Sequence, residues 1–304
     1  MAARTGIAGS FGIKAETTWG TFVTVDEFLP IISETLTRTE EHTISRAIRS
    51  GRTVLASEQW NGGIIEVGGP VELELSNKNV RTLFKAMFGI ETGASPYTYT
   101  PVDNTQSLTL QVGRPGIAGT VHPFTYTGAK VASWEISAEV GETVSLTVEF
   151  IAAAEHTSYA LASPSYTASM LPYKFTGATL TIAGSAVNTV RSMSLSGDNM
   201  LARRNFLGSQ TTAEPFATDL YEYTGEVVTD FESLTAYSRF VTGTEAALVM
   251  TFTRAASTIV ITTNVKFNGA TPTIEGREVL AQSLPFMCVG STTDASAITV
   301  VYTP

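Results

Sequence analysis

The chain has one cysteine in 304 residues, Cys288, so it lacks both a disulfide framework and the cysteine pairs that hold structural zinc. It also lacks the apolar segment of a signal peptide and any apolar run long enough to cross a membrane. These absences favour synthesis and folding in a reducing cytoplasm, without membrane contact. Cys288 lies between Met287 and Val289, a setting typical of a core residue rather than a nucleophile.

Charge is also scarce in this sequence. Only 15% of the residues are charged, and 28 acidic against 19 basic residues give a net charge of −9. No stretch resembles the basic stripe of a protein that grips nucleic acid. An acidic protein can nevertheless surround DNA if its task is to avoid sticking to it. The hydrophobic fraction of 43% excludes a disordered chain and is enough for one large or two ordinary cores.

A catalytic set of residues is missing as well. The histidines lie in polar or proline-flanked segments, without a cysteine or paired carboxylates at a useful spacing: His42, His122 and His156. The glycine-punctuated segment at residues 5–25 has no Lys-Ser/Thr pair and no following helix, which argues against a phosphate-binding loop. We therefore expect no enzymatic activity, no metal and no cofactor.

Threonine, serine, valine and glycine are abundant, which favours sheets and turns over helices. The clearest strands cover residues 133–140 and 144–150, where polar and apolar side chains alternate, so each strand is half buried. An odd loop at 141–143 pairs Val140 with Val144 and aligns the apolar faces of both strands. We predict this register for the hairpin.

A strand that leads into a helix occurs twice. Residues 71–75 form the first such strand, and the helix after it carries an apolar stripe made of Val80, Leu83, Phe84 and Met87. In residues 225–243 the corresponding stripe consists of Leu234, Tyr237, Phe240 and Val241. Gly89 and Gly243 follow the two helices, where a left-handed residue can end each of them.

The spacing of these units predicts that the chain contains two copies of one module. Gly69 and Gly225 are 156 residues apart, and Gly89 and Gly243 are 154 residues apart. We therefore predict a mainly β protein with two tandem β-sandwich domains, each flanked by one α-helix. The predicted divisions are an N-terminal arm at 1–25, a first domain at 26–153, a linker at 154–173 and a second domain at 174–304.

Two long polar loops occupy matching places in the predicted copies. The first runs over residues 40–63, and long loops in compact domains are usually functional. We expect both loops to contact a partner through arginines, although ordinary surface charges are the alternative reading. The candidate inter-subunit residues are Arg46, Arg49, Arg52, Arg203 and Arg204.

The order of these elements resembles the tail tube (major tail) proteins of long-tailed, non-contractile bacteriophages. The resembling pieces are a Gly-Ile-x-x-Glu-x-Thr-Trp-Gly segment at residues 12–20, the Phe-Leu-Pro that opens a strand at 28–30, a long hairpin loop, a strand feeding one helix, and a closing hairpin. The likeness covers most of residues 6–153 and, through the internal repeat, residues 174–304.

This resemblance implies a structural virion protein whose β-sandwich domains join around a ring, with rings stacked into a tube. Two fused domains imply a trimer with pseudo-sixfold symmetry, while a hexamer with a decorating second domain stays open. The implied partners are further copies of the chain and the tail terminator, tape measure and distal tail proteins. The implied location is the virion tail, after assembly in the host cytoplasm, with DNA passing through unbound.

A lumen that DNA traverses should carry acidic and hydroxyl groups rather than a ladder of cations. On that argument the candidate lumen-facing residues are Ser133, Glu135, Ser137, Glu139, Thr147 and Glu149. An ordinary solvated outer face is the alternative for these residues. The alternative for the whole chain is another β-rich virion or surface module, either a capsid decoration protein or a carbohydrate-binding adhesin. The scattered positions of Trp19, Trp60 and Trp134 do not favour sugar binding.

Overall fold

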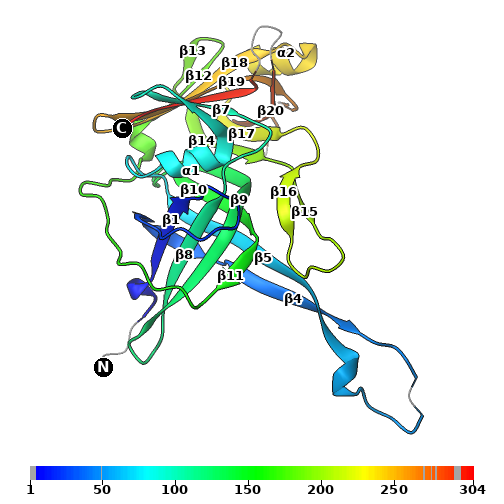
Figure 1. The fold of residues 1–304 in the computed structure, drawn as a ribbon. Helices are drawn as coiled ribbons and strands as arrows, with labels where there is room; N and C mark the ends of the chain where they lie inside the picture. Colours follow the sequence, from blue (N-terminus) through cyan, green and yellow to red (C-terminus); the bar gives the residue numbers. More distant parts are fainter. Residues whose placement is uncertain (1–4, 49, 270, 275, 278, 291–295) are drawn as a thin grey trace.

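The computed structural model describes residues 5–304 apart from 49, 270, 275, 278 and 291–295. The described residues form an extensive antiparallel β-structure with two short α-helices (Figure 1). The prediction of a mainly β chain is confirmed. Below, "first half" means residues 5–156 and "second half" means residues 174–304.

Strands of the first half follow one order of antiparallel pairing. β2 pairs with β1, β1 with β8, β8 with β9, β9 with β10 and β10 with β5, and both β3 and β4 lie along the other edge of β5. The short β11 also pairs with β9. Their bounds are β1 Ser10–Ala15, β2 Glu27–Leu29, β3 Ile31–Glu34, β4 Thr37–Ile44, β5 Trp60–Glu74, β8 Leu108–Pro115, β9 Val121–Glu139, β10 Ser145–Ala152 and β11 Ala154–His156.

Strands of the second half repeat this pairing order. β13 pairs with β12, β12 with β18, β18 with β19, β19 with β20, β20 with β17 and β17 with β14. The irregularities repeat as well, because a β-bulge at 31–33 has its counterpart at 190–192. The bounds are β12 Ala178–Ile182, β13 Ser185–Val187, β14 Val190–Asp198, β17 Glu222–Asp230, β18 Ala246–Arg254, β19 Ser257–Phe267 and β20 Ala281–Val289.

Each half carries one of the helices. α1, Arg81–Phe88, buries Leu83, Phe84 and Met87 as its stripe predicts, and it ends at Gly89 with a positive φ of 100°. α2, Thr235–Thr242, ends at Gly243 in the left-handed conformation, but none of its residues is fully buried. Leu234 and Val241 are 63% and 62% exposed, so the second stripe is only partly covered within the chain.

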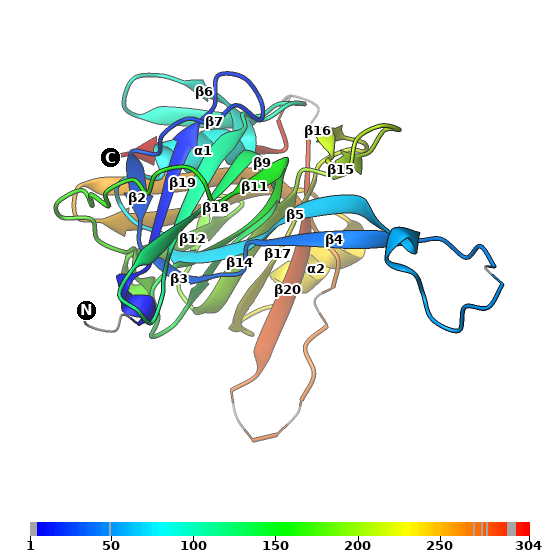
Figure 2. The same ribbon diagram turned by 60° about the horizontal axis from the view of Figure 1, so that its bottom comes forward.

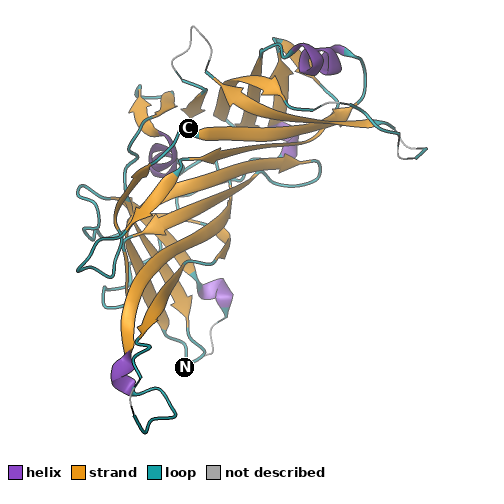
Figure 3. Cartoon of the chain, turned by 90° about the vertical axis from the view of Figure 1, so that its right-hand side faces the viewer, coloured by secondary structure: helices purple, strands orange, loops and turns teal. Residues whose placement is uncertain are grey.

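The two halves are joined by two strand pairings. Residues 133–139 of β9 pair with residues 192–198 of β14, and β21 (Ile298–Thr303) pairs with both β19 and β7 (Tyr97–Pro101). β6 (Gly89–Thr92) completes a hairpin with β7. The buried residues of both halves form one continuous hydrophobic cluster. Figure 3 shows the strands of the two halves from the side.

A long two-stranded arm projects from the first half. β4 and β5 pair as far as Ile44 and Trp60, and the tip contains the 3-10 turn Ser57–Gln59 (Figures 1 and 2). Much of the segment 40–63 is therefore strand rather than loop. In the second half the corresponding hairpin, β15 (Leu201–Arg204) and β16 (Ala213–Ala217), lies back against β5 of the first half.

The Gly-Ile-x-x-Glu-x-Thr-Trp-Gly segment folds within its own chain. β1 is a sheet strand whose Phe11 and Ile13 are fully buried. The buried Glu16 carboxylate accepts hydrogen bonds from the backbone N–H of Gly20 at 2.9 Å and of Gly128 at 2.8 Å. It also accepts them from the hydroxyls of Ser107, just before β8, at 2.7 Å and of Thr109 in β8 at 2.9 Å. Glu16 therefore ties the N-terminal segment to β8 and β9 of the first half.

The predicted register of the β9–β10 hairpin is wrong. The β9–β10 loop is odd, as expected, but it spans 140–144, and Ile136 pairs with Leu146, so the register differs by two residues from the predicted Val140–Val144 pair. Because a shift of two preserves the side-chain alternation, the apolar faces still align.

Candidate functional site

The six candidate lumen residues lie on one face of the β9–β10 hairpin. Ser133 pairs with Glu149, Glu135 with Thr147, and Ser137 with Ser145, while Glu139 continues the same face of β9. The alternate residues point the other way and are buried, among them Trp134, Ile136 and Val148. The structure therefore places these residues together on a solvated surface.

This surface continues across strands from both halves. Along β5, Glu72 is opposite Thr147, and along β14, Ser196 is opposite Glu135. β17 extends it beside β14, and Ser283 of β20 donates a hydrogen bond to Glu226. We call this surface the polar face; beyond the six candidates it includes Ser33, Glu72, Glu74, Ser145, Ser192, Ser194, Ser196, Asp198, Glu222, Thr224, Glu226 and Ser283.

Sequence reasoning missed most of the polar face, although a signal was present. Val71 to Leu75 alternates apolar and glutamate residues, and Ser192 to Ser196 alternates serine with apolar residues. These patterns match that of β9, but only the strand pairing shows that all of them belong to one sheet. What could not be read from the pattern is that β14 of the second half lies directly beside β9 of the first.

The charge of the polar face is of one sign. Its charged residues are all glutamate or aspartate. Pro70, Val228, Pro285 and Met287 lie on the same side of the sheet, and beyond Met287 the neighbouring strand β19 carries Lys266 on that side. Glu135, Glu139, Glu149 and Glu222 are exposed, so water solvates their carboxylates. These carboxylates repel phosphate.

The loop arginines do not gather in one place. Arg46 and Arg52 are exposed at the tip of the β4–β5 arm, and Arg49 lies outside the described residues. Large apolar side chains share the arm with them and are also exposed: Ile44, Ile48, Val54, Leu55, Trp60 and Ile64. An arm that exposes this much apolar surface is typical of a segment that packs against another molecule.

Arg203 and Arg204 instead serve contacts inside the chain. Nη2 of Arg203 donates a hydrogen bond of 2.8 Å to the carbonyl of Val67 in β5, and its Nε lies 4.0 Å from Glu66. Burial of this guanidinium lowers its pKa. The guanidinium of Arg204 lies over the ring of Phe216, 5.0 Å from its centroid. Both arginines belong to the hairpin that covers the first half.

Sequence reasoning did not identify Lys130, whose ammonium is buried under the same hairpin. Its side chain is 1% exposed, and Nζ donates a hydrogen bond of 2.6 Å to Glu214 of β16. Nζ also donates to Asn104 and, at 3.3 Å, to the carbonyl of Pro215, and it lies 5.3 Å from the ring centroid of Phe216. A buried cation is thus paired with a carboxylate across the junction of the halves.

The described part of the chain fits neither of two kinds of chemical site, a metal site and a reactive thiol. It contains no group of three or more His, Cys, Asp or Glu residues placed to hold a metal. Cys288 is buried, and burial raises the pKa of its thiol to about 11, so the nucleophilic thiolate is disfavoured. Within the same residues, the helices are too short or too polar to span a membrane.

In a comparison with known protein families, the model of a family described as phage tail tube protein matches residues 6–288. No curated protein matches the chain.

Proposed function

Because the chain belongs to the phage tail tube protein family, we propose that its copies form rings that stack into the tube of a phage tail, through which the genome passes into the host. The mainly β fold with its large antiparallel sheet fits this role. The polar face is the observation that carries the proposal. In the tube it lines the bore.

The physical argument rests on what DNA meets inside a tube. A cation ladder would hold each phosphate and slow the passage, whereas carboxylates and hydroxyls repel phosphate and remain hydrated. Screening at physiological salt limits this repulsion to about 8 Å, so it acts on DNA close to the wall. The acidic and hydroxyl residues of the polar face come from neighbouring strands of both halves, which suits a continuous wall.

We propose that three copies form each ring. The divisions 26–153 and 174–304 act as two tube domains joined by the linker 154–173, so three chains supply six similar units. The repeated strand order and the repeated β-bulge support this arrangement. The exposed arm supports contacts between copies, because its apolar side chains are exposed in the single chain. Closure of a ring would cover these side chains and the unpaired edges of the sheet.

The proposed location and partners follow from the role as a tail tube protein. The tube lies in the virion tail and is assembled in the host cytoplasm, and its ends meet terminator and distal tail proteins while tape measure protein fills it during assembly. DNA passes without specific binding. Membership of this family supports a structural rather than an enzymatic task.

Electron microscopy of concentrated purified protein tests the proposal. We expect rings or tubes with a central hole; dispersed single chains at every concentration contradict it. In phage particles, the double change Glu135→Lys and Glu139→Lys should leave tails intact and slow DNA ejection. Glu232→Lys with Glu245→Lys makes the same charge change at exposed positions outside the polar face. If both doubles eject at the wild-type rate, the face is not the bore.

A further inference from the structure

The strand pairings identify which residues of the two halves are equivalent. Gly69 pairs with Phe150 in the first half, and Gly225 pairs with Phe286 in the second. Phe150 pairs in turn with Val131, and Phe286 with Phe267. The residue before each of these, Lys130 and Lys266, therefore occupies the same position in its half.

The arms can be matched in the same way. Counted back along the sequence, Glu58 lies eleven residues before Gly69, and Glu214 lies eleven residues before Gly225. Trp60 and Phe216 lie nine residues before the same two glycines. An acid and an aromatic residue thus recur at matching positions in the two arms. These are the residue types that surround Lys130.

The first half is already covered by the second half. β14 pairs along residues 133–139 of β9, and the β15–β16 hairpin brings Glu214 and Phe216 onto Lys130. Asn199, between β14 and β15, donates hydrogen bonds to the carbonyls of Met87 and Val131 at 3.1 and 3.0 Å. This junction shows which contacts form when one half docks on the other.

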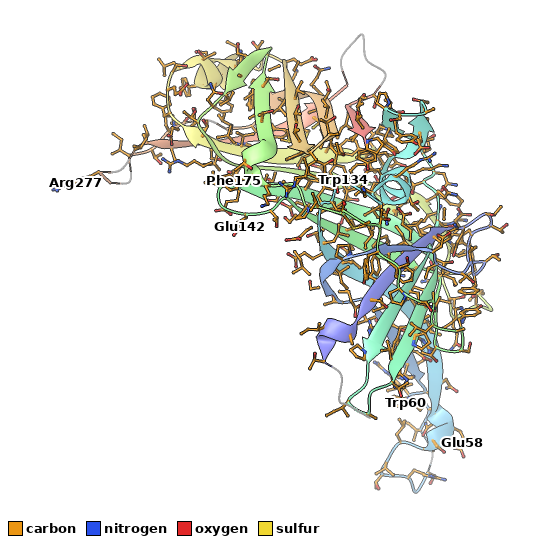
Figure 4. The ribbon with its side chains drawn as sticks, turned by 90° about the vertical axis from the view of Figure 1, so that its left-hand side faces the viewer. Glu58, Trp60, Trp134, Glu142, Phe175 and Arg277 are labelled. Carbon is orange, nitrogen blue, oxygen red and sulfur yellow. The ribbon has the colours of Figure 1, made fainter. Side chains whose placement is uncertain are left out.

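The surfaces that would form the equivalent junction with a second copy are not covered by the described residues of the chain itself. Within the described residues β3 and β4 pair only with β5, although the matching strand β14 pairs on both edges. Lys266 is exposed, whereas Lys130 is buried. Trp60 is 51% exposed on the arm, and Figure 4 shows it with Glu58 on the part of the chain that projects farthest from the sheets.

Within one chain, the second half docks on the first half. We propose that a second copy uses its first half to dock in the same way on the second half of this chain. The arm of the second copy crosses the sheet and places the Glu58 carboxylate and the Trp60 ring on Lys266. This proposal rests on the proposed function and names the surfaces through which its rings close.

The proposal explains the composition of both surfaces. A lysine covered by an apolar arm requires a carboxylate, since an unpaired buried charge is costly, and an indole is the strongest aromatic partner for an ammonium. Each copy offers one arm and one Lys266 surface, so the contact is head-to-tail, the type that forms a ring when the rotation between copies closes. The pseudo-sixfold ring then alternates junctions within and between chains.

Cross-linking between copies tests the contact directly. Chains labelled with nitrogen-14 and nitrogen-15 are mixed before assembly and treated with a carbodiimide, which joins an ammonium to a touching carboxylate. We expect a Lys266–Glu58 peptide with mixed labels. The Lys130–Glu214 peptide is the internal control, because it should carry a single label. Tubes that yield the control peptide and no mixed Lys266–Glu58 peptide overturn the inference while leaving the proposed function intact.

A charge swap gives an independent readout. Lys266→Glu and Glu58→Lys should each raise the concentration needed for assembly by about tenfold or more, as expected for opposed charges in an interface. Combining the two should restore assembly. Lys174→Glu makes the same charge change at another exposed position and should assemble normally. If Lys266→Glu assembles as the wild type does, the inference is wrong; if the wild type forms no rings, the proposed function fails with it.

Discussion

Replacing Glu214 with glutamine tests the junction between the two halves of one chain. The substitution keeps the shape of the side chain and removes its charge, so the Lys130 ammonium, 1% exposed, loses its carboxylate partner at 2.6 Å. Removing one partner of a buried ion pair costs about 3–5 kcal/mol. Because the Glu214 side chain is 32% exposed and Lys130 keeps Asn104 and the Pro215 carbonyl, we expect a smaller cost of about 2 kcal/mol.

Thermal unfolding measures this cost. A loss of about 2 kcal/mol lowers Tm by about 4–8 °C for units of this size. Asp26→Asn is the control, since it removes the carboxylate of an exposed pair with Lys14 and should cost under about 1 kcal/mol. In a Lys130→Met background the Glu214→Gln change should have little effect, because no buried charge remains to be paired.

The reasoning is refuted by either of two results. One is a Glu214→Gln protein that melts within the range of Asp26→Asn. The other is an undiminished effect of Glu214→Gln in the Lys130→Met background, which would place the energy of Glu214 somewhere other than its contact with Lys130.

Further predictions concern the fold, the arm and the thiol. Glu16→Gln should cost about 3 kcal/mol by unfolding titration, because four hydrogen bonds to a buried carboxylate are weakened; an unchanged midpoint contradicts this. Gly197→Val should destabilise by at least about 1–3 kcal/mol, since a Cβ there lies 2.5 Å from the Trp134 ring; a wild-type Tm contradicts it. Deletion of 42–58 should leave a folded chain that forms no tubes, and tubes seen by microscopy would exclude the arm as a coupling device. Cys288 should resist alkylation at pH 8 until the chain unfolds, because burial raises its thiol pKa to about 11; rapid native labelling would show an open site.

Much of the architecture could be predicted from local pattern. The alternation in β9 and β10 and the apolar stripe of α1 gave the right elements, since both depend on which side chains face the core. The chosen lumen residues do share a face, because a strand's alternation survives an error of two in hairpin register.

What could not be predicted depends on contacts between distant segments. The loop arginines look alike in sequence, yet Arg203 binds the Val67 carbonyl while Arg46 and Arg52 are exposed on the arm. Lys130 looks like a surface residue until the β15–β16 hairpin covers it. Polar residues in the arm concealed its strands, because a two-stranded ribbon without a buried face shows no apolar alternation.

Electron cryomicroscopy of assembled tubes tests the central claim most directly. We expect stacked rings of three chains in which Glu135, Glu149, Asp198 and Glu222 line a central bore. A reconstruction that places these carboxylates on the outer wall, or in which the chains form no closed ring, would contradict the account.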